Sequence, residues 1–197
     1  MRVADKITSS RLIMAPLFYV LYFLPGRVLI FTILLWLLFI GSAVSDMLDG
    51  MVARRRGEVS DFGKLYDPFA DTLAQLSFFL CFVIDGIFHP ILFLLVLYRE
   101  FSILFMRNLM LRKGVSQGAR MGGKIKTVSY ITAVALALLA STCLRLGLFL
   151  PYYDFIRVTA SVVFMLSVAI AAGSFFDYLI LYRKTPGGDD FEGKNLQ

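Results

Sequence analysis

Six apolar segments, the first of them short, are separated by polar connections and constrain the fold of this chain more than any other feature. A helix needs about 20 residues to cross ~30 Å of hydrocarbon at 1.5 Å per residue. The chain is 58% hydrophobic and only 17% charged, which lies outside the usual range of soluble domains. We therefore predict an all-α integral membrane protein with six transmembrane helices. The expected spans cover residues 12–24, 28–46, 65–84, 90–111, 125–150 and 155–181.

The two ends of the chain differ from the apolar segments between them. Residues 1–11 form an amphipathic lead-in that we expect to lie along the membrane interface. We predict one membrane domain over residues 1–185, followed by a polar cytoplasmic tail, 186–197, that we expect to be disordered. Cys81 and Cys143 both fall in expected spans, which favours buried, reduced thiols over a disulfide.

Four aspartates stand at the edges of the second and third apolar segments: Asp46, Asp49, Asp67 and Asp71. A charged carboxylate near the hydrocarbon core costs roughly 2.5–3.5 kcal/mol on insertion scales, so several together must be paired, hydrated or bound to cations. Carboxylate oxygens are the ligands that hard divalent ions such as Mg²⁺ prefer. The cluster therefore indicates a metal site.

The spacing of these acids supports that interpretation. Residues three or four apart share one face of a helix, so each pair of acids lies in a stripe with small residues that leave room beside the carboxylates. If the two helices face each other, the four acids converge. The stripes are Asp46, Asp49, Gly50 and Ala53, and Gly63, Asp67, Ala70, Asp71 and Ala74. A competing interpretation makes Asp67 an N-cap followed by Pro68 in the first helical turn.

Lys and Arg are distributed unevenly among the connections. They gather in the N-terminal stretch, the second and fourth connections and the tail, whereas the other connections carry Arg27, Arg145 and Arg157. Since cytoplasmic loops carry an excess of these residues, we predict that both termini and the acidic cluster face the cytoplasm, in the cytoplasmic (inner) membrane. The net charge of +6 has the same origin, so we expect no nucleic-acid binding.

The acidic stretch follows a pattern of fixed gaps, Asp46-x-x-Asp49-Gly50-x-x-Ala53-Arg54, eight residues, then Gly63-x-x-x-Asp67-x-x-x-Asp71. In this pattern the chain resembles the CDP-alcohol phosphotransferase family at every fixed position. Further residues resemble, in type and spacing, those of the phosphatidylglycerophosphate synthase branch of that family. They are Thr8, Arg11 and Pro16 at the first span, Arg99-Glu100 and Arg107 in the fourth, and Gly123-Lys124-Ile125-Lys126-Thr127 at the start of the fifth. For Arg11 the alternative is an interfacial anchor.

The resemblance implies an enzyme of membrane phospholipid biosynthesis, a homodimer that transfers a phosphatidyl group from CDP-diacylglycerol to a small alcohol and releases CMP. It implies two divalent cations, Mg²⁺ or Mn²⁺, held by the four aspartates, with Asp71 also acting as the base. Gly50, Ala53, Arg54 and Gly63 would bind the nucleotide.

The same branch implies glycerol 3-phosphate as the acceptor and phosphatidylglycerophosphate as the product. Its phosphate would be bound by Arg99, Arg107, Lys124 and Lys126. Arg99 has the structural alternative of pairing with Glu100 or Asp177. Inositol phosphate, serine or another small alcohol stay open as acceptors.

Two other classes of function remain as alternatives. A cation transporter would also use membrane acids, but broken helices or repeat symmetry, which transporters often show, are not visible in the sequence. A membrane scaffold without activity would not need all four acids. His89 follows the predicted outer turn at Asp85-Gly86, so we exclude it as a base.

Overall fold

The computed structural model describes residues 3–24, 29–56, 61–112 and 121–184. Within these ranges, side chains are described over 9–24, 29–45, 66–110, 125–180 and 182–183. The described chain is helical throughout, with short turns between helices, which confirms the all-α prediction. Its helices are α1 (Val3–Phe23), α2 (Leu29–Arg56), α3 (Asp61–Ile84), α4 (Pro90–Arg112), α5 (Met121–Leu146), the 3-10 turn η1 (Leu150–Tyr152) and α6 (Tyr153–Lys184).

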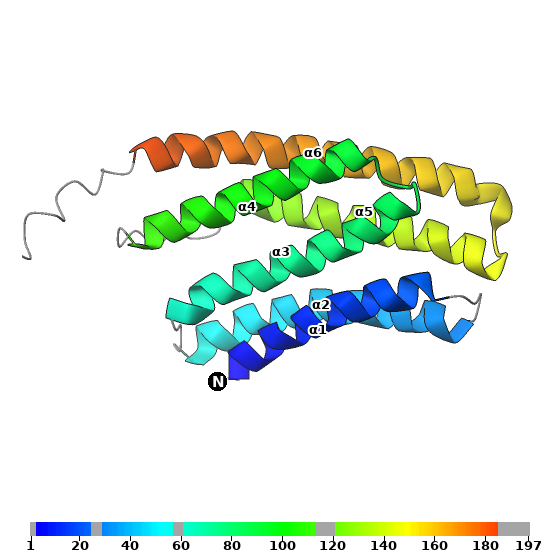
Figure 1. The fold of residues 1–197 in the computed structure, drawn as a ribbon, viewed down its shortest axis with the longest axis horizontal. Helices are drawn as coiled ribbons and strands as arrows, with labels where there is room; N and C mark the ends of the chain where they lie inside the picture. The colour runs from blue at the N-terminus through cyan, green and yellow to red at the C-terminus, as the bar shows by residue number, and fades with distance from the viewer. Residues whose placement is uncertain (1–2, 25–28, 57–60, 113–120, 185–197) are drawn as a thin grey trace, which may run out of the picture.

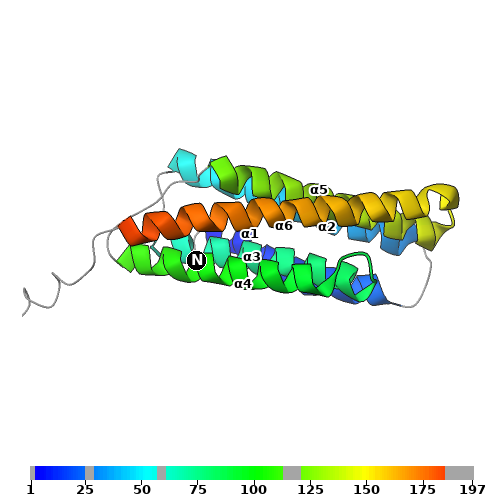
Figure 2. The same ribbon diagram turned by 90° about the horizontal axis from the view of Figure 1, so that it is seen from above.

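The six α-helices run lengthwise in one bundle, each antiparallel to the next along the chain (Figures 1 and 2). In Figure 1, α3 crosses the middle of the bundle, with α1 and α2 on one side and α4, α5 and α6 on the other. Contacts agree with this arrangement, because α3 packs on α1, α4 and α5, while α5 also packs along α6. The acids of α3 therefore lie centrally, and α1 and α4 can both reach them.

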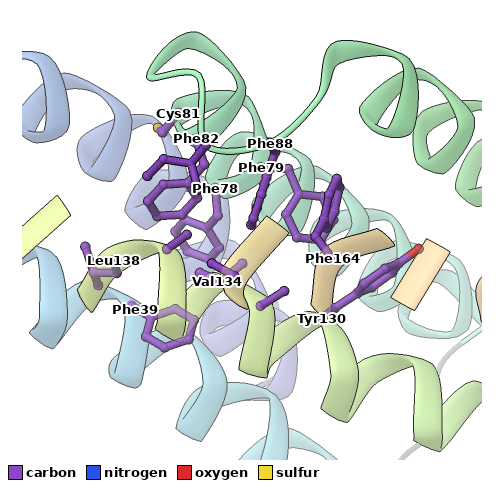
Figure 3. Packing of buried hydrophobic residues seen from close by; sticks show 14 of the residues in the cluster. Phe39, Phe78, Phe79, Cys81, Phe82, Phe88, Tyr130, Val134, Leu138 and Phe164 are labelled. Atoms are coloured by element: carbon purple, nitrogen blue, oxygen red, sulfur yellow. The ribbon is translucent and has the colours of Figure 1, made fainter. Parts of the chain in front are cut away.

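Aromatic side chains form the centre of the bundle (Figure 3). The Phe164 ring of α6 stacks on Phe88 with centroids 4.1 Å apart and meets Phe79 of α3 edge-on at 4.9 Å. Tyr130 of α5 packs against Phe79 at 5.1 Å, and Figure 3 shows its hydroxyl pointing away from the cluster. Such pairs add about 0.5–1.5 kcal/mol each beyond the area they bury. They fix α3, α5 and α6 relative to one another.

Length and composition allow a membrane crossing for three helical segments of the described chain: Tyr66–Ile84, Ile125–Leu146 and Leu150–Ile180. Ser9–Phe23 and Leu29–Ser45 are apolar but shorter. α4 carries Arg99, Glu100 and Arg107, which lower its hydropathy. The protein is thus an integral membrane protein with six α-helices in its described residues, while six crossings stay a prediction. α1 is continuous from Val3, so residues 3–11 of the amphipathic lead-in are part of the first helix, and the interfacial position of the lead-in stays a prediction.

The turn between α3 and α4 marks the end of the bundle remote from the acids. Gly86 has φ +72°, a left-handed conformation that suits glycine, as the predicted turn requires. The Tyr22 hydroxyl donates to Asp85 Oδ2 at 2.6 Å, which ties α1 to this turn. His89 Nδ1 accepts from the Ile91 amide at 3.3 Å. Asp71 lies thirteen residues before the end of α3, or ~20 Å away along the helix, so His89 is far from it.

Two of the structural alternatives from the sequence can now be decided. The interpretation of Asp67 as an N-cap is wrong, because α3 begins at Asp61 and Pro68 lies inside the helix. The interpretation of Cys81 and Cys143 as buried free thiols is confirmed.

Candidate active site in a cavity between the helices

A cavity of about 650 Å³ opens between the helices, within the usual size range of small-molecule sites. All six helices contribute to its lining, and the charged residues come from α1, α3, α4, α5 and α6. These charged residues are Arg11, Asp71, Arg99, Glu100, Arg107, Lys126 and Asp177. A concentration of charge inside a membrane protein is a functional-site signal, since such residues are expensive there.

Asp71 and Arg11 form an ion pair that joins α3 to α1. The two partners differ in environment, because the Arg11 side chain is 2% exposed and that of Asp71 is 41% exposed. Arg11 therefore lies behind the carboxylate, and Asp71 faces the cavity. The interfacial-anchor interpretation of Arg11 is wrong, since this side chain is buried in the bundle. Ala70 and Ala74, which flank Asp71 in the predicted stripe, are buried as well.

A buried ionic network lies on the other wall of the cavity, between α4, α5 and α6. Glu100 is 6% exposed, and its Oε1 accepts from Arg99 Nη1 at 2.9 Å and from Lys126 Nζ at 2.8 Å. Arg99 also donates from Nε to the Ala171 carbonyl at 3.2 Å and from Nη2 to Ser174 Oγ at 2.6 Å. Arg99 thus pairs with Glu100, one of the two partners considered from the sequence, and holds α4 against α6.

Apart from the Arg11–Asp71 ion pair, three residues that line the cavity carry a buried polar atom that lacks a hydrogen-bond partner in the described part of the chain. These atoms are Arg107 Nε, the Tyr130 hydroxyl and the Tyr178 hydroxyl. An unsatisfied buried polar group costs about 1–3 kcal/mol, so native structures seldom leave one without water or ligand. The cavity is therefore equipped for a polar occupant.

Comparison with known proteins places the sequence in a family. The sequence profile of CDP-alcohol phosphatidyltransferases matches residues 1–173, most of the chain. The chain belongs to the CDP-alcohol phosphatidyltransferase family. This confirms the resemblance found in the sequence and makes the protein an enzyme of that class.

Several bacterial relatives cover most of both chains. The chain is 38% identical over 192 residues to a CDP-diacylglycerol–glycerol-3-phosphate 3-phosphatidyltransferase of Treponema pallidum, covering 91% of this chain and 88% of the relative. A protein of the same name from Bacillus subtilis is 30% identical over 160 residues, covering 76% and 82%. Another, from Aquifex aeolicus, is 28% identical over 185 residues, covering 91% and 95%.

Part of the family motif lies outside the described side chains. Asp46, Asp49, Gly50, Ala53 and Arg54 belong to α2, Gly63 to α3 and Lys124 to α5, but their side chains are not among those described. The described residues alone contain no group of three acids, His or Cys that would hold a metal. Convergence of the four acids therefore stays a prediction.

The described half of the acidic cluster fits a divalent cation. Asp67 and Asp71 lie one turn apart on α3 and offer carboxylate oxygens, the donors that Mg²⁺ and Mn²⁺ prefer. Asp71 is open to the cavity, and a carboxylate has about four lone-pair sites, so the contact with Arg11 leaves oxygen lone pairs for a cation. The residues present are thus compatible with the metal that the motif implies.

The structure adds cavity residues that sequence reasoning did not place in the site: Arg11, Glu100, Tyr130 and Tyr178. The sequence offered a signal for Arg11 and Glu100 as site residues, since both are charged residues within or beside apolar segments. Tyr130 and Tyr178 carried none, because tyrosine is common in membrane helices near the interface. Arg99, Arg107 and Lys126 lie on the cavity as Asp71 does, and their roles stay predictions.

Proposed function

We propose that the protein is a phosphatidylglycerophosphate synthase of the cytoplasmic membrane. It transfers the phosphatidyl group of CDP-diacylglycerol to glycerol 3-phosphate and forms phosphatidylglycerophosphate and CMP. Relatives named for this activity cover most of the chain and support the substrates. The observation that carries the proposal is the single cavity that joins Asp71 to the basic residues Arg107 and Lys126. An acceptor with a hydroxyl at one end and a phosphate at the other matches these two groups.

In the proposed reaction the acceptor hydroxyl attacks the phosphatidyl phosphorus, and the bond from phosphorus to the CMP oxygen breaks. Asp71 takes the proton of the attacking hydroxyl, for which its exposure to the cavity suits it. Arg107 and Lys126 bind the acceptor's phosphate and orient its hydroxyl toward Asp71. Positioning and charge neutralisation dominate phosphoryl transfer, so little covalent chemistry is required of the protein.

Asp46, Asp49, Asp67 and Asp71 would hold two divalent cations, Mg²⁺ or Mn²⁺. Bound there, the cations would supply charge neutralisation for the diphosphate and the departing CMP. Gly50, Ala53, Arg54 and Gly63, which complete the motif, would bind the nucleotide. Arg99 takes a supporting part in the acceptor pocket because three of its donors already have protein partners, and Lys124 would complete the pocket.

The proposal includes an orientation and an assembly. Both termini and the cavity face the cytoplasm, as the distribution of Lys and Arg indicates, and the acyl chains of the donor stay in the bilayer. A homodimer is expected from the family resemblance.

An acceptor panel tests the proposed function. The purified protein is given CDP-diacylglycerol with Mg²⁺ or Mn²⁺ and, in turn, glycerol 3-phosphate, inositol phosphate and serine, and CMP and the lipid product are measured. We expect CMP release that depends on glycerol 3-phosphate. Removal of the metal by a chelator should abolish this release. Release with another acceptor alone would identify a different transferase. No acceptor-dependent CMP, together with uptake of a labelled cation into vesicles, would indicate a transporter.

A further inference from the structure

Glu100 is an acid among the basic residues that α4 and α5 contribute to the cavity. Its side chain is buried, and one oxygen accepts from both Arg99 and Lys126 at 2.9 and 2.8 Å. An anion pocket would attract a phosphate more strongly without this carboxylate. The position of Glu100 therefore needs a reason beyond attraction of the ligand.

Linkage of the helices does not require Glu100. Arg99 already joins α4 to α6 through the Ala171 carbonyl and Ser174 Oγ. Lys126 differs, because Glu100 is its hydrogen-bond partner in the described part of the chain, and its other described contact is the Tyr130 ring, 5.2 Å from Nζ. Lys126 is therefore the cation whose position depends most on Glu100.

The charge of the pocket also depends on Glu100. Arg99, Lys126 and Glu100 together carry one positive charge; Arg107 adds one, and Asp177, which also lines the cavity, offsets one. A phosphate monoester carries nearly two negative charges near neutral pH, since its second pKa is about 6. On the facing wall, Arg11 and Asp71 offset each other. Glu100 thus offsets one of the three cations on this wall, and the wall stays net positive toward a phosphate monoester.

We propose that Glu100 is a positioning residue that holds Lys126, and with it Arg99, in place for the phosphate of the acceptor. The inference rests on the proposed function. Glu100 itself does not contact the acceptor. It keeps an ammonium and a guanidinium close together in a buried site when the pocket is empty, and so prepares the pocket for its ligand.

Glu100→Gln is the first test, because it removes the charge and keeps the shape. We expect the KM for glycerol 3-phosphate to rise about tenfold or more, since a hydrogen bond to a charged group is lost. The KM for CDP-diacylglycerol and kcat should stay within about threefold. Asp154→Asn, which removes an exposed acid at the start of α6, is the matched control and should leave both KM values unchanged. An unchanged or lowered acceptor KM in Glu100→Gln would overturn the proposal.

A double-mutant cycle asks whether Glu100 acts through Lys126. Lys126→Met alone should raise the acceptor KM, and adding Glu100→Gln should raise it little further, because the residue being positioned is already absent. Multiplying effects would contradict the proposal. If Glu100→Gln does not fold, Glu100→Asp retains the charge but withdraws it by one methylene, and the same rise in acceptor KM is expected.

Thermal unfolding with added glycerol 3-phosphate separates this proposal from the proposed function. The wild-type protein should be stabilised by glycerol 3-phosphate and not by glycerol, and Glu100→Gln should lose this shift. If wild type binds but produces no phosphatidylglycerophosphate, the proposed function fails while the role of Glu100 stands. If wild type is active and Glu100→Gln shows both the wild-type shift and the wild-type KM, the role of Glu100 fails alone.

Discussion

Asp71 and Arg11 form an ion pair, but their side chains differ in exposure. This difference in exposure separates their roles. Both residues line the cavity, but the carboxylate is open to it and the Arg11 side chain is almost fully buried. A group that takes a proton from the substrate needs an exposed atom, and the Asp71 side chain is 41% exposed whereas that of Arg11 is 2% exposed. We therefore assign proton transfer to Asp71 and orientation of its carboxylate to Arg11.

Asp71→Asn keeps the shape of the side chain and removes its basicity. We expect kcat to fall by about 10²–10⁴-fold, the usual contribution of a general base, while CDP-diacylglycerol still binds. Steady-state kinetics and a donor-binding measurement check both parts. Turnover near that of wild type would remove Asp71 from the base role.

Arg11→Met replaces the buried cation by an apolar side chain of similar length. We expect a loss of about 2 kcal/mol in the free energy of unfolding, because a charge-assisted hydrogen bond disappears, together with a lower kcat. Arg157→Met, at an exposed position of α6, is the matched control and should change neither quantity. Equal thermal stability and kcat in Arg11→Met and wild type would contradict the role of Arg11.

At the scale of the elements, the apolar segments predicted the existence of the helices correctly but not the residues at which the helices begin and end. The third segment was predicted from residue 65, whereas α3 begins at Asp61, and the second was predicted to end at 46, whereas α2 continues to Arg56. Backbone hydrogen bonding does not stop where hydropathy falls, so a helix can run on beyond the membrane. Arg99 and Arg107 could be placed on one face from their spacing of about two turns. The pairing of Glu100 with Lys126 could not, because it depends on how α5 lies against α4.

The aromatic cluster is the element-scale feature that holds α6 in place. Phe164 is fully buried against Phe79 and Phe88, so Phe164→Ala leaves a cavity and should cost about 3–5 kcal/mol of stability, seen as a lower unfolding temperature. Phe155→Ala on the same helix is the control, since Phe155 is 72% exposed. Equal losses for the two variants would show that the cluster does not stabilise the bundle.

At the scale of the whole molecule, the bundle has two different ends. The cavity lies toward the end where α3 begins and α6 ends, and the α3–α4 turn lies at the other (Figure 1). The motif in the sequence predicted the chemistry from α2 and α3 alone. The proposed binding residues for the acceptor come from α4 and α5, where the sequence motif has fewer fixed positions. Their place on one cavity depends on how the helices pack and could not be predicted from the sequence.

The proposed orientation predicts which end reacts with a membrane-impermeant thiol reagent. In a chain with Cys81 and Cys143 replaced by Ser, His89→Cys should be labelled on intact cells whose outer face is accessible, and Arg183→Cys only after permeabilisation. Both positions are exposed. Labelling of Arg183→Cys on intact cells and protection of His89→Cys would show the reverse orientation.

The central claim is that one cavity brings the acceptor's phosphate to α4 and α5 and its hydroxyl to Asp71. The most direct measurement is the KM of Arg107→Gln for each substrate, with Arg157→Gln as the exposed control. The account predicts a rise of about tenfold or more in the KM for glycerol 3-phosphate, since Arg107 loses a charge-assisted contact, and a donor KM within about twofold of wild type. A rise confined to the KM for CDP-diacylglycerol, or no change in either value, would contradict it.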